Sequence, residues 1–176
     1  MVVTAKRNLG LALKVIVWGT GNVGRPAIRA VISHHDLDLV GVIVASDKKV
    51  GLDAGQIAGV GATGVIATDN WRSIIDMGAD AVVYTATADT RPEEAMNDLL
   101  ACLEAGINVV STAFYSYLDP ASTPQEALKP ITDVCARSGA SLFVSGIDPG
   151  WVMDMLPGVL SGAVSGIREI RTREVF

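Results

Sequence analysis

Residues 14–25 read KVIVWGTGNVGR and decide the fold of this chain. The run at 15–17 is apolar and β-branched, which predicts a strand buried on both faces. Three glycines follow directly in the spacing Gly-X-Gly-X-X-Gly, so a strand, a tight turn and a helix succeed one another. Gly19 permits the turn, Gly21 lets a bulky anion approach the backbone, and Gly24 lets the new helix pack closely on the strand.

The start of this predicted helix is suited to an anion. Its first N–H groups have no partner within the helix, and the helix dipole favours negative charge there. Arg25 is a cation at this disfavoured position, so it fits better beside a bound diphosphate, although a solvated arginine would be tolerated. A glycine-rich turn without a ligand is the alternative, because glycine makes up 18 of the 176 residues.

The residues that follow the turn favour a dinucleotide site. Apolar residues recur at helical spacing at Val23, Ala27, Ala30 and Val31, and a second apolar run follows at 39–44. This strand–helix–strand unit has the length that a dinucleotide-binding unit requires. We therefore expect the diphosphate of a dinucleotide to contact Gly19, Thr20, Gly21, Asn22, Val23 and Gly24.

The end of the second apolar run is expected to meet the adenosine ribose of the cofactor. Asp47 would accept hydrogen bonds from the ribose hydroxyls of NAD, whereas Ser46, Lys48 and Lys49 would hold the extra phosphate of NADP. We favour NADP over NAD, because these three side chains offer a nest for a phosphate. A solvated charged turn without cofactor contact is the alternative.

Further strands and helices continue the alternation along the chain. Strands are predicted at 64–67, 81–84, 107–111 and 142–145, and a helical turn at 54–58 lies in a glycine-rich surface connection. Helices are predicted from a cap at Asp69 or Asn70 to Met77, from a capping box at 90–93 to Gly106, and from 122–125 to Gly139. Pro130 is expected to kink or split the last of these helices.

Loops after the later strands open at the carboxyl edge of the sheet, where ligands of such folds bind. Small residues in these loops suit the nicotinamide half of the cofactor, and they are Thr85, Ala86, Thr87, Ser111 and Thr112. Asp148 follows the strand at 142–145 and is the candidate catalytic base. Its alternative role is an Asp-Pro-Gly turn in which the aspartate caps the backbone.

Composition points to a small-molecule ligand. The chain has 14 Lys and Arg against 19 Asp and Glu, a net charge of −5 without a basic block, which argues against nucleic acid or a membrane surface as partner. Cys102 and Cys135 are expected as buried reduced thiols. No Cys/His spacing suggests a metal, and His34 and His35 are expected at the surface. The apolar stretch at 9–13 is too short to span a membrane, so we expect a cytoplasmic protein.

Together these patterns predict an α/β fold, a doubly wound (Rossmann) parallel sheet with helices on both faces. Residues 1–12 would form an N-terminal extension and 13–150 the NAD(P)-binding domain. Residues 151–176 would form a linking helix and the first strand of a second, α+β domain. The chain ends on apolar Val175 and Phe176 without a turn or polar cap, so we expect only the start of that domain.

Five ordered motifs carry a resemblance to a known family. They are VWGTGNVGR, VGVIVASDKKVGLDAG, YTATADTRPEEA, AGINVVST and SGIDPGWVMDMLP. From Val15 to its end the chain resembles the dihydrodipicolinate reductase-like proteins, which include 2,4-diaminopentanoate dehydrogenase. The segment Asp148–Gly150 also resembles the Trp-Asp-Pro-Gly turn of meso-diaminopimelate dehydrogenase. The resemblance implies an NAD(P)-dependent oxidoreductase that interconverts a primary amine and an imine. The amine would be its small-molecule partner.

The resemblance also implies a sheet-rich second domain that covers the nicotinamide, binds substrate and often builds a homo-oligomer. Here that domain is barely begun, and cofactor binding should survive its absence better than turnover. Two alternatives stay open. One is a cyclic-imine reductase of the dihydrodipicolinate reductase type, and the other is a non-catalytic dinucleotide-binding or redox-sensing module.

Overall fold

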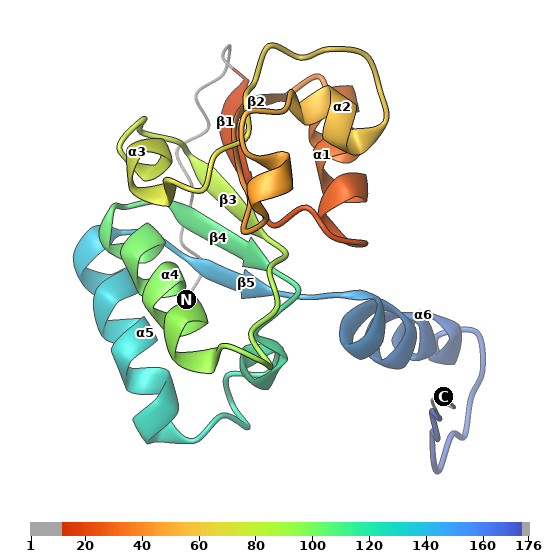
Figure 1. The fold of residues 1–176 in the computed structure, drawn as a ribbon. Helices are drawn as coiled ribbons and strands as arrows, with labels where there is room; N and C mark the ends of the chain where they lie inside the picture. The colour runs from red at the N-terminus through yellow and green to blue at the C-terminus, as the bar shows by residue number, and fades with distance from the viewer. Residues whose placement is uncertain (1–11, 174–176) are drawn as a thin grey trace. The chain divides into compact units, whose positions relative to one another are not determined.

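The computed structural model describes residues 12–173, and five strands form one parallel sheet in the order β2-β1-β3-β4-β5 (Figure 1). The strands are β1 Leu13–Trp18, β2 Leu37–Ile43, β3 Ala81–Tyr84, β4 Asn108–Ser111 and β5 Leu142–Val144. The predicted parallel sheet flanked by helices is therefore confirmed. The N-terminal extension, apart from residue 12, and the apolar end at 175–176 lie outside the described residues. The described chain divides into two compact units between Val83 and Tyr84.

The first unit is built on the stretch that decides the fold. β1 pairs with β2 in parallel, and α1 (Gly24–Ser33) packs on both strands (Figure 1). α1 buries Gly24, Ile28 and Val31, which recur at helical spacing, against Val15 and Val17 of β1. This apolar core fixes the turn between β1 and α1 at the carboxyl end of β1.

The predicted strand at 64–67 does not form. Between β2 and β3 lie η1 (Asp47–Lys49), α2 (Ala54–Ala58) and α3 (Trp71–Ile75), with only isolated bridges from Ile43 to Thr68 and from Asp53 to Ile66. The physical reason is the carboxylate of Asp53, which accepts the backbone N–H groups of Gly55, Thr63 and Gly64 at 2.7, 3.0 and 2.8 Å. These bonds close a turn between 53 and 64. The segment then pairs with residues 52–54 through Val65 and Ala67, and in the described chain it meets β2 only at Thr68, which bonds to Val42 and Val44. The predicted helical turn at 54–58 is confirmed.

Asp53 makes the first unit sensitive to acid. Its pKa is lowered, with the hydrogen bond from the Thr63 N–H as the largest cause. A carboxylate with a lowered folded-state pKa stabilises the fold above its unfolded pKa, and that stability is lost as pH falls through the folded-state value. We therefore expect wild type to lose more unfolding free energy than Asp53→Asn between pH 7 and about pH 3. Urea unfolding at several pH values measures this difference, and parallel curves for the two proteins would contradict it.

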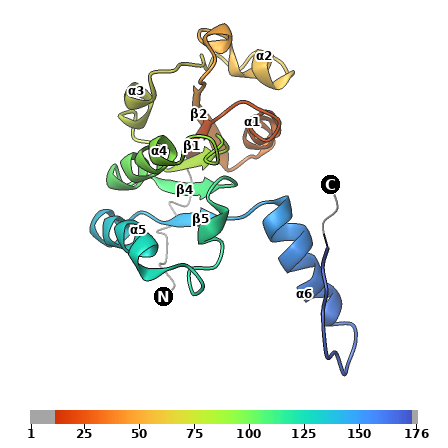
Figure 2. The ribbon, with the colours of Figure 1, turned by 60° about the horizontal axis from the view of Figure 1, so that its bottom comes forward.

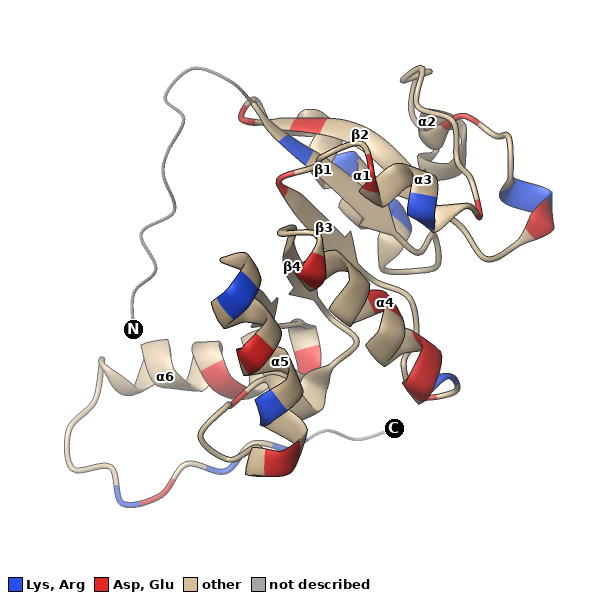
Figure 3. Cartoon of the chain, turned by 90° about the vertical axis from the view of Figure 1, so that its left-hand side faces the viewer, with Lys and Arg blue, Asp and Glu red and all other residues tan. Residues whose placement is uncertain are grey.

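The second unit holds β4, β5, α4 (Pro92–Glu104) and α5 (Gln125–Ser138), and the two helices lie side by side (Figures 1 and 2). Beyond β5 the chain continues as η3 (Ile147–Met155) and α6 (Leu156–Ser161), which pack on each other. Figure 3, coloured by residue type, shows acidic positions alone on α4 and positions of both charge signs along α5.

Two predictions about these helix ends are wrong, and a third, that Pro130 kinks or splits its helix, is wrong as to the split. α4 begins after Arg91 without a side-chain cap, so the predicted capping box at 90–93 is absent; Pro92, whose φ is preset for a helix, starts it instead. α5 follows Pro124 and not a cap from Ser122 or Thr123, because the hydroxyl of Thr123 donates to the carbonyl oxygens of Ser116 and Asp119. Pro130 lies inside a continuous α5 and does not split it.

Candidate cofactor site

The glycine turn leads from the carboxyl end of β1 into α1. Gly19 has φ +102°, a region that favours glycine, and its N–H donates to the Ile43 carbonyl of β2 at 2.9 Å. Gly21, Asn22 and Val23 are exposed, whereas Gly24 is buried under the start of α1. Within the described part of the chain, the N–H groups of residues 21–24 have no hydrogen-bond partner. The turn therefore presents a row of unsatisfied donors, as an anion site requires.

A lysine from the next loop lies against this turn. The Nζ of Lys49, in η1, donates to the carbonyl oxygen of Thr20 at 2.8 Å and to its Oγ1 at 3.1 Å. Thr20 is 7% exposed, and Lys49 is half-buried. The structure thus brings together two predicted cofactor residues that are 29 positions apart. Sequence reasoning missed the contact, because nothing in the spacing distinguishes Lys49 from Lys48.

The other residues predicted to meet the ribose stay at the surface. Ser46, Asp47 and Lys48 are all exposed at the end of β2. Ser46 precedes η1, and its carbonyl accepts the N–H of Lys49 at 2.8 Å. β1 and β2 run in parallel, so the glycine turn and these side chains lie at the same edge of the sheet.

Two arginines of α1, Arg25 and Arg29, lie close to the end of α2. A Cβ built on Gly59, the residue that ends α2, would lie 3.9 Å from a terminal nitrogen of Arg25. Arg29, one turn further along α1, donates to the Ala58 carbonyl at 2.7 Å. Both cations therefore face the end of α2, where carbonyl groups carry partial negative charge. Arg25 at the start of α1 thus does not by itself require a diphosphate.

In the second unit, the loops after β3 and β4 contain the residues predicted for the nicotinamide half. Thr85 and Ala86 are half-buried, and Thr87 and Thr112 are exposed. Ser111 is 1% exposed, and its hydroxyl donates to the Tyr84 carbonyl at 3.1 Å and accepts the Ala113 N–H at 3.0 Å. The Ser111 hydroxyl thus holds the backbone of these loops.

An exposed pair also joins the two loops. The Tyr115 hydroxyl donates to the Asp89 carboxylate at 3.0 Å, and this bond is the largest cause of the raised pKa of Tyr115. The neighbouring Phe114 is buried against the ring of Tyr84, with centroids 5.3 Å apart. The buried ring and the exposed bond together fix how the loop after β4 leaves the sheet.

Behind these loops lies a buried polar network that sequence reasoning missed. The Tyr84 hydroxyl donates to a carboxylate oxygen of Asp98 at 3.0 Å, and Arg91 donates to the same carboxylate at 2.9 Å and to the Tyr84 oxygen at 3.1 Å. Burial first, and then the Asp98 charge, raise the pKa of Tyr84 and raise the pKa of the Cys102 thiol to about 12. Cys102 is therefore an unreactive core thiol, buried as predicted, whereas Cys135 is only half-buried.

Asp148 is exposed in the turn that follows β5. The Asp148–Pro149 peptide is cis, Gly150 has φ +132°, and the Trp151 N–H donates to the Gly146 carbonyl at 2.8 Å. The predicted turn is present. Among the described residues, however, no N–H donates to the Asp148 side chain, so the turn does not use it as a cap.

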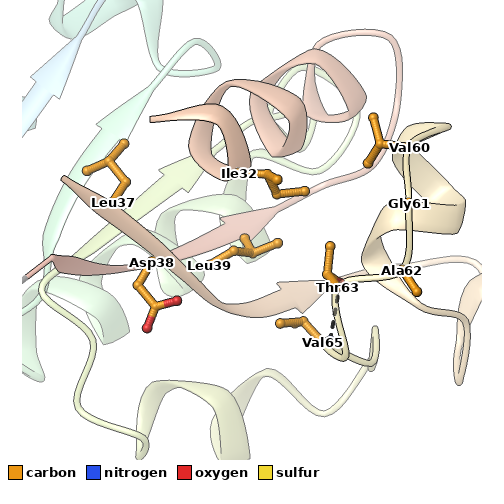
Figure 4. A pocket seen from close by; sticks show the side chains of 9 residues that line it. All are labelled: Ile32, Leu37, Asp38, Leu39, Val60, Gly61, Ala62, Thr63 and Val65. Carbon is orange, nitrogen blue, oxygen red and sulfur yellow. Dashed lines mark hydrogen bonds between the residues drawn. The ribbon is translucent and has the colours of Figure 1, made fainter. Parts of the chain in front are cut away.

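A pocket of about 420 Å³ lies elsewhere in the first unit (Figure 4). It is bordered by Ile32 at the end of α1, by Leu37 and Leu39 at the start of β2, and by the loop at 60–65. The glycine turn follows the opposite, carboxyl end of the parallel strands. This pocket is therefore separate from the candidate cofactor site.

Two further observations bear on the sequence predictions. No helix in the described range 12–173 is long and apolar enough to cross a membrane. His34, His35 and Asp36 are exposed, as predicted for the histidines, and their ligand atoms lie within 4.8 Å of one another. His35 and Asp36 already pair with each other at 3.2 Å.

Comparisons with known proteins agree with this arrangement. The chain is 44% identical over 165 residues to the amine dehydrogenase of Streptomyces virginiae, a match that covers 93% of this chain and 46% of that protein. It is 26% identical over 172 residues to the 2,4-diaminopentanoate dehydrogenase of Acetoanaerobium sticklandii, with the same two coverages. The chain thus spans about half the length of these curated relatives.

Solved structures show the same fold. The amine dehydrogenase from Mycobacterium smegmatis superposes with a TM-score of 0.71 at 24% identity, covering 88% of this chain and 45% of that one. Residues 13–117 match the family described as dihydrodipicolinate reductase, N-terminus, and this range includes the glycine turn, Lys49 and the loops after β3 and β4. The chain therefore belongs to the dihydrodipicolinate reductase N-terminal family.

Proposed function

We propose that this chain is the cofactor-binding part of an NAD(P)-dependent oxidoreductase that acts on primary amines. The observation that carries the proposal is the glycine turn at the start of α1, where the N–H groups of residues 21–24 have no partner among the described residues. The diphosphate of a nicotinamide dinucleotide would accept these hydrogen bonds. The protein would then hold the cofactor's reactive ring and the substrate together and exclude water.

An amine substrate is favoured over a cyclic imine by the extent of the matches. The amine dehydrogenase and the diaminopentanoate dehydrogenase align with 93% of the chain. The 4-hydroxy-tetrahydrodipicolinate reductases of Methanopyrus kandleri and Rippkaea orientalis align with less of it, 46% and 75%, at 37% and 26% identity. The similarity to the amine enzymes thus continues beyond the cofactor motifs, into the turn that contains Asp148. A homo-oligomeric state and a cytoplasmic location belong to the same proposal.

NADP is the proposed form of the cofactor. Lys48 and Ser46 are exposed at the carboxyl end of β2, beside the strand that leads into the glycine turn. A 2′-phosphate at this place would gain charge-assisted hydrogen bonds from both side chains. Titration with NADPH and NADH, followed by nicotinamide fluorescence, tests the proposal: we expect both to bind and NADPH to bind more tightly. If neither binds, the proposed function is wrong.

For catalysis, we propose that the loops after β3 and β4 contact the nicotinamide half and that Asp148 is the base. A bound nicotinamide would supply the hydride acceptor for oxidation of the amine at the carbon that bears nitrogen, and Asp148 would take a proton from the nitrogen. The imine then reacts with water to give a carbonyl compound and ammonia. Asp148 is supported by its exposure and by the lack of an N–H bonded to it in the described chain.

Asp148→Asn is expected to lower amine-dependent reduction of NADP⁺ by about 100-fold or more, because the amide cannot accept the proton. The affinity for NADPH should stay unchanged, which separates a catalytic loss from a folding defect. Asp154→Asn, an exposed acid in the same segment, is the matched control and should keep its activity. Unchanged turnover in Asp148→Asn would remove Asp148 as the base. NADPH binding without turnover in a protein that also carries the second domain would favour the non-catalytic module.

A further inference from the structure

The structure separates the roles of two adjacent lysines, Lys48 and Lys49. We propose that Lys49 is a positioning residue, which orients the glycine turn for the diphosphate, and that of the two lysines only Lys48 distinguishes NADP from NAD. The inference rests on the proposed function and deepens it. The contact that carries it is the pair of hydrogen bonds from the Lys49 ammonium to Thr20, at 2.8 Å to its carbonyl and 3.1 Å to its hydroxyl.

The contact is firmly held at both ends. On the lysine side, η1 is fixed by backbone bonds from the Lys49 N–H to the Ser46 carbonyl and from the Leu52 N–H to the Lys49 carbonyl, at 2.8 and 3.2 Å. On the turn side, Thr20 is 7% exposed and follows Gly19, whose N–H is bonded to β2. A hydrogen bond from a charged donor, shielded in this way from water, is stronger than one at the surface.

The geometry of the peptide bond turns this contact into an effect on the anion site. In a planar trans peptide, the carbonyl of one residue and the N–H of the next point in opposite directions. Fixing the Thr20 carbonyl toward Lys49 therefore directs the Gly21 N–H away from Lys49, out of the turn. Gly21 is exposed, and its N–H is one of the unpaired donors. Lys49 thus sets the direction of a diphosphate donor before the cofactor arrives.

The diphosphate is common to NAD and NADP, so the loss of Lys49 should weaken both cofactors equally. Two of the three N–H donors of its ammonium are already occupied by Thr20. Lys48, by contrast, is exposed, and in the described range it makes no hydrogen bond or ion pair. A side chain in this state is able to turn toward a 2′-phosphate, which NADP alone carries.

The test compares Lys49→Met with Lys48→Met by fluorescence titration of NADPH and NADH. We expect Lys49→Met to raise both dissociation constants by the same factor, about 10-fold, and to leave their ratio unchanged. Lys48→Met should raise the constant for NADPH alone. Lys49→Arg keeps a charged donor at the turn and should recover most of the affinity for both cofactors.

A change in the NADPH-to-NADH ratio in Lys49→Met, or no change in either constant, would overturn the inference. If wild type binds neither cofactor, the proposed function is wrong. The positioning role of Lys49 can still be measured without a ligand. In the cofactor-free protein, the ¹⁵N order parameter of Gly21 should fall below the rigid-backbone value of about 0.85 in Lys49→Met but not in Lys48→Met. Equal order parameters in the two variants would contradict the proposed positioning.

Discussion

Gly21→Val is expected to raise the dissociation constant for NADPH about 100-fold and to leave the cofactor-free protein folded. A branched side chain at this position would occupy the space in which a diphosphate approaches the turn. The loss of one or two charge-assisted hydrogen bonds from the N–H groups at 21–24 corresponds to about 3 kcal/mol of binding free energy. This is the largest effect on the cofactor that we expect from a single substitution.

The structure makes this variant a clean test. A Cβ built on Gly21 meets no atom within 4 Å, and Gly21 does not have the positive φ that disfavours other residues. A Cβ at this position therefore meets no atom of the free protein, so we expect Gly21→Val to fold. Gly61 has the same two properties but lies in the loop after α2, beside the pocket of Figure 4. Gly61→Val is the matched control, for which neither the melting temperature nor NADPH affinity should change.

Fluorescence titration and thermal unfolding of both variants decide the outcome. If Gly21→Val folds and binds NADPH as wild type does, the diphosphate does not lie on the turn, and the assignment of Gly19 to Gly24 fails with it. If Gly21→Val melts well below Gly61→Val, the turn is more tightly packed than the free space around Gly21 indicates.

The sequence predicted the glycine turn and the strands around it because their signals are local. The apolar run of β1, the three glycines and the helical spacing of α1 lie within about twenty consecutive residues. The spacing of apolar residues within each element indicates by itself whether it is a strand or a helix. The five parallel strands were likewise predicted within one or two residues. The extra strand at 64–67 was wrong because Asp53 bonds to residues ten and eleven positions away, which a local pattern cannot show.

In the candidate site, too, some residues could be predicted from local sequence and others could not. Gly19 and Gly21 could be assigned from sequence, because their function depends on having no side chain. The different situations of Lys48 and Lys49 could not, since they depend on which side of the 3₁₀ turn η1 faces Thr20. Ser111 followed a strand as expected, but its hydroxyl bonds to the backbone of the adjacent loops. The strand's end was predictable, and the direction of the side chain was not.

The buried network around Asp98 does have a signal in the sequence. Asp98 is an acid on the buried stripe of α4, among Ala95, Leu99 and Cys102. A carboxylate at such a position is rarely buried without a partner. Arg91, just before the proline that starts α4, and Tyr84 at the end of β3 are those partners. An acid within an apolar helical stripe thus predicts a buried cation nearby, even where the sequence does not identify it.

Asp98→Ala is expected to lower the free energy of unfolding by about 3 kcal/mol, the largest stability effect of any substitution considered. Removal of one partner from a buried ion pair leaves the other charge uncompensated, which typically costs 3–5 kcal/mol. The lower end applies here because the Arg91 side chain is 35% exposed and keeps part of its hydration, whereas Asp98 is only 6% exposed. The Tyr84 hydroxyl, fully buried, also loses its acceptor.

Two further variants separate the charge from the packing. Tyr84→Phe leaves the Arg91–Asp98 pair intact and should cost only about 1 kcal/mol. Asp133→Ala breaks the exposed pair with Lys129 on α5 and should cost less than about 0.5 kcal/mol. Urea unfolding gives all three values. If Asp98→Ala were no more destabilising than Asp133→Ala, the Arg91–Asp98 pair would behave as a surface pair. The loop after β3, which ends at Arg91, would then be held to α4 by apolar contacts and not by this network.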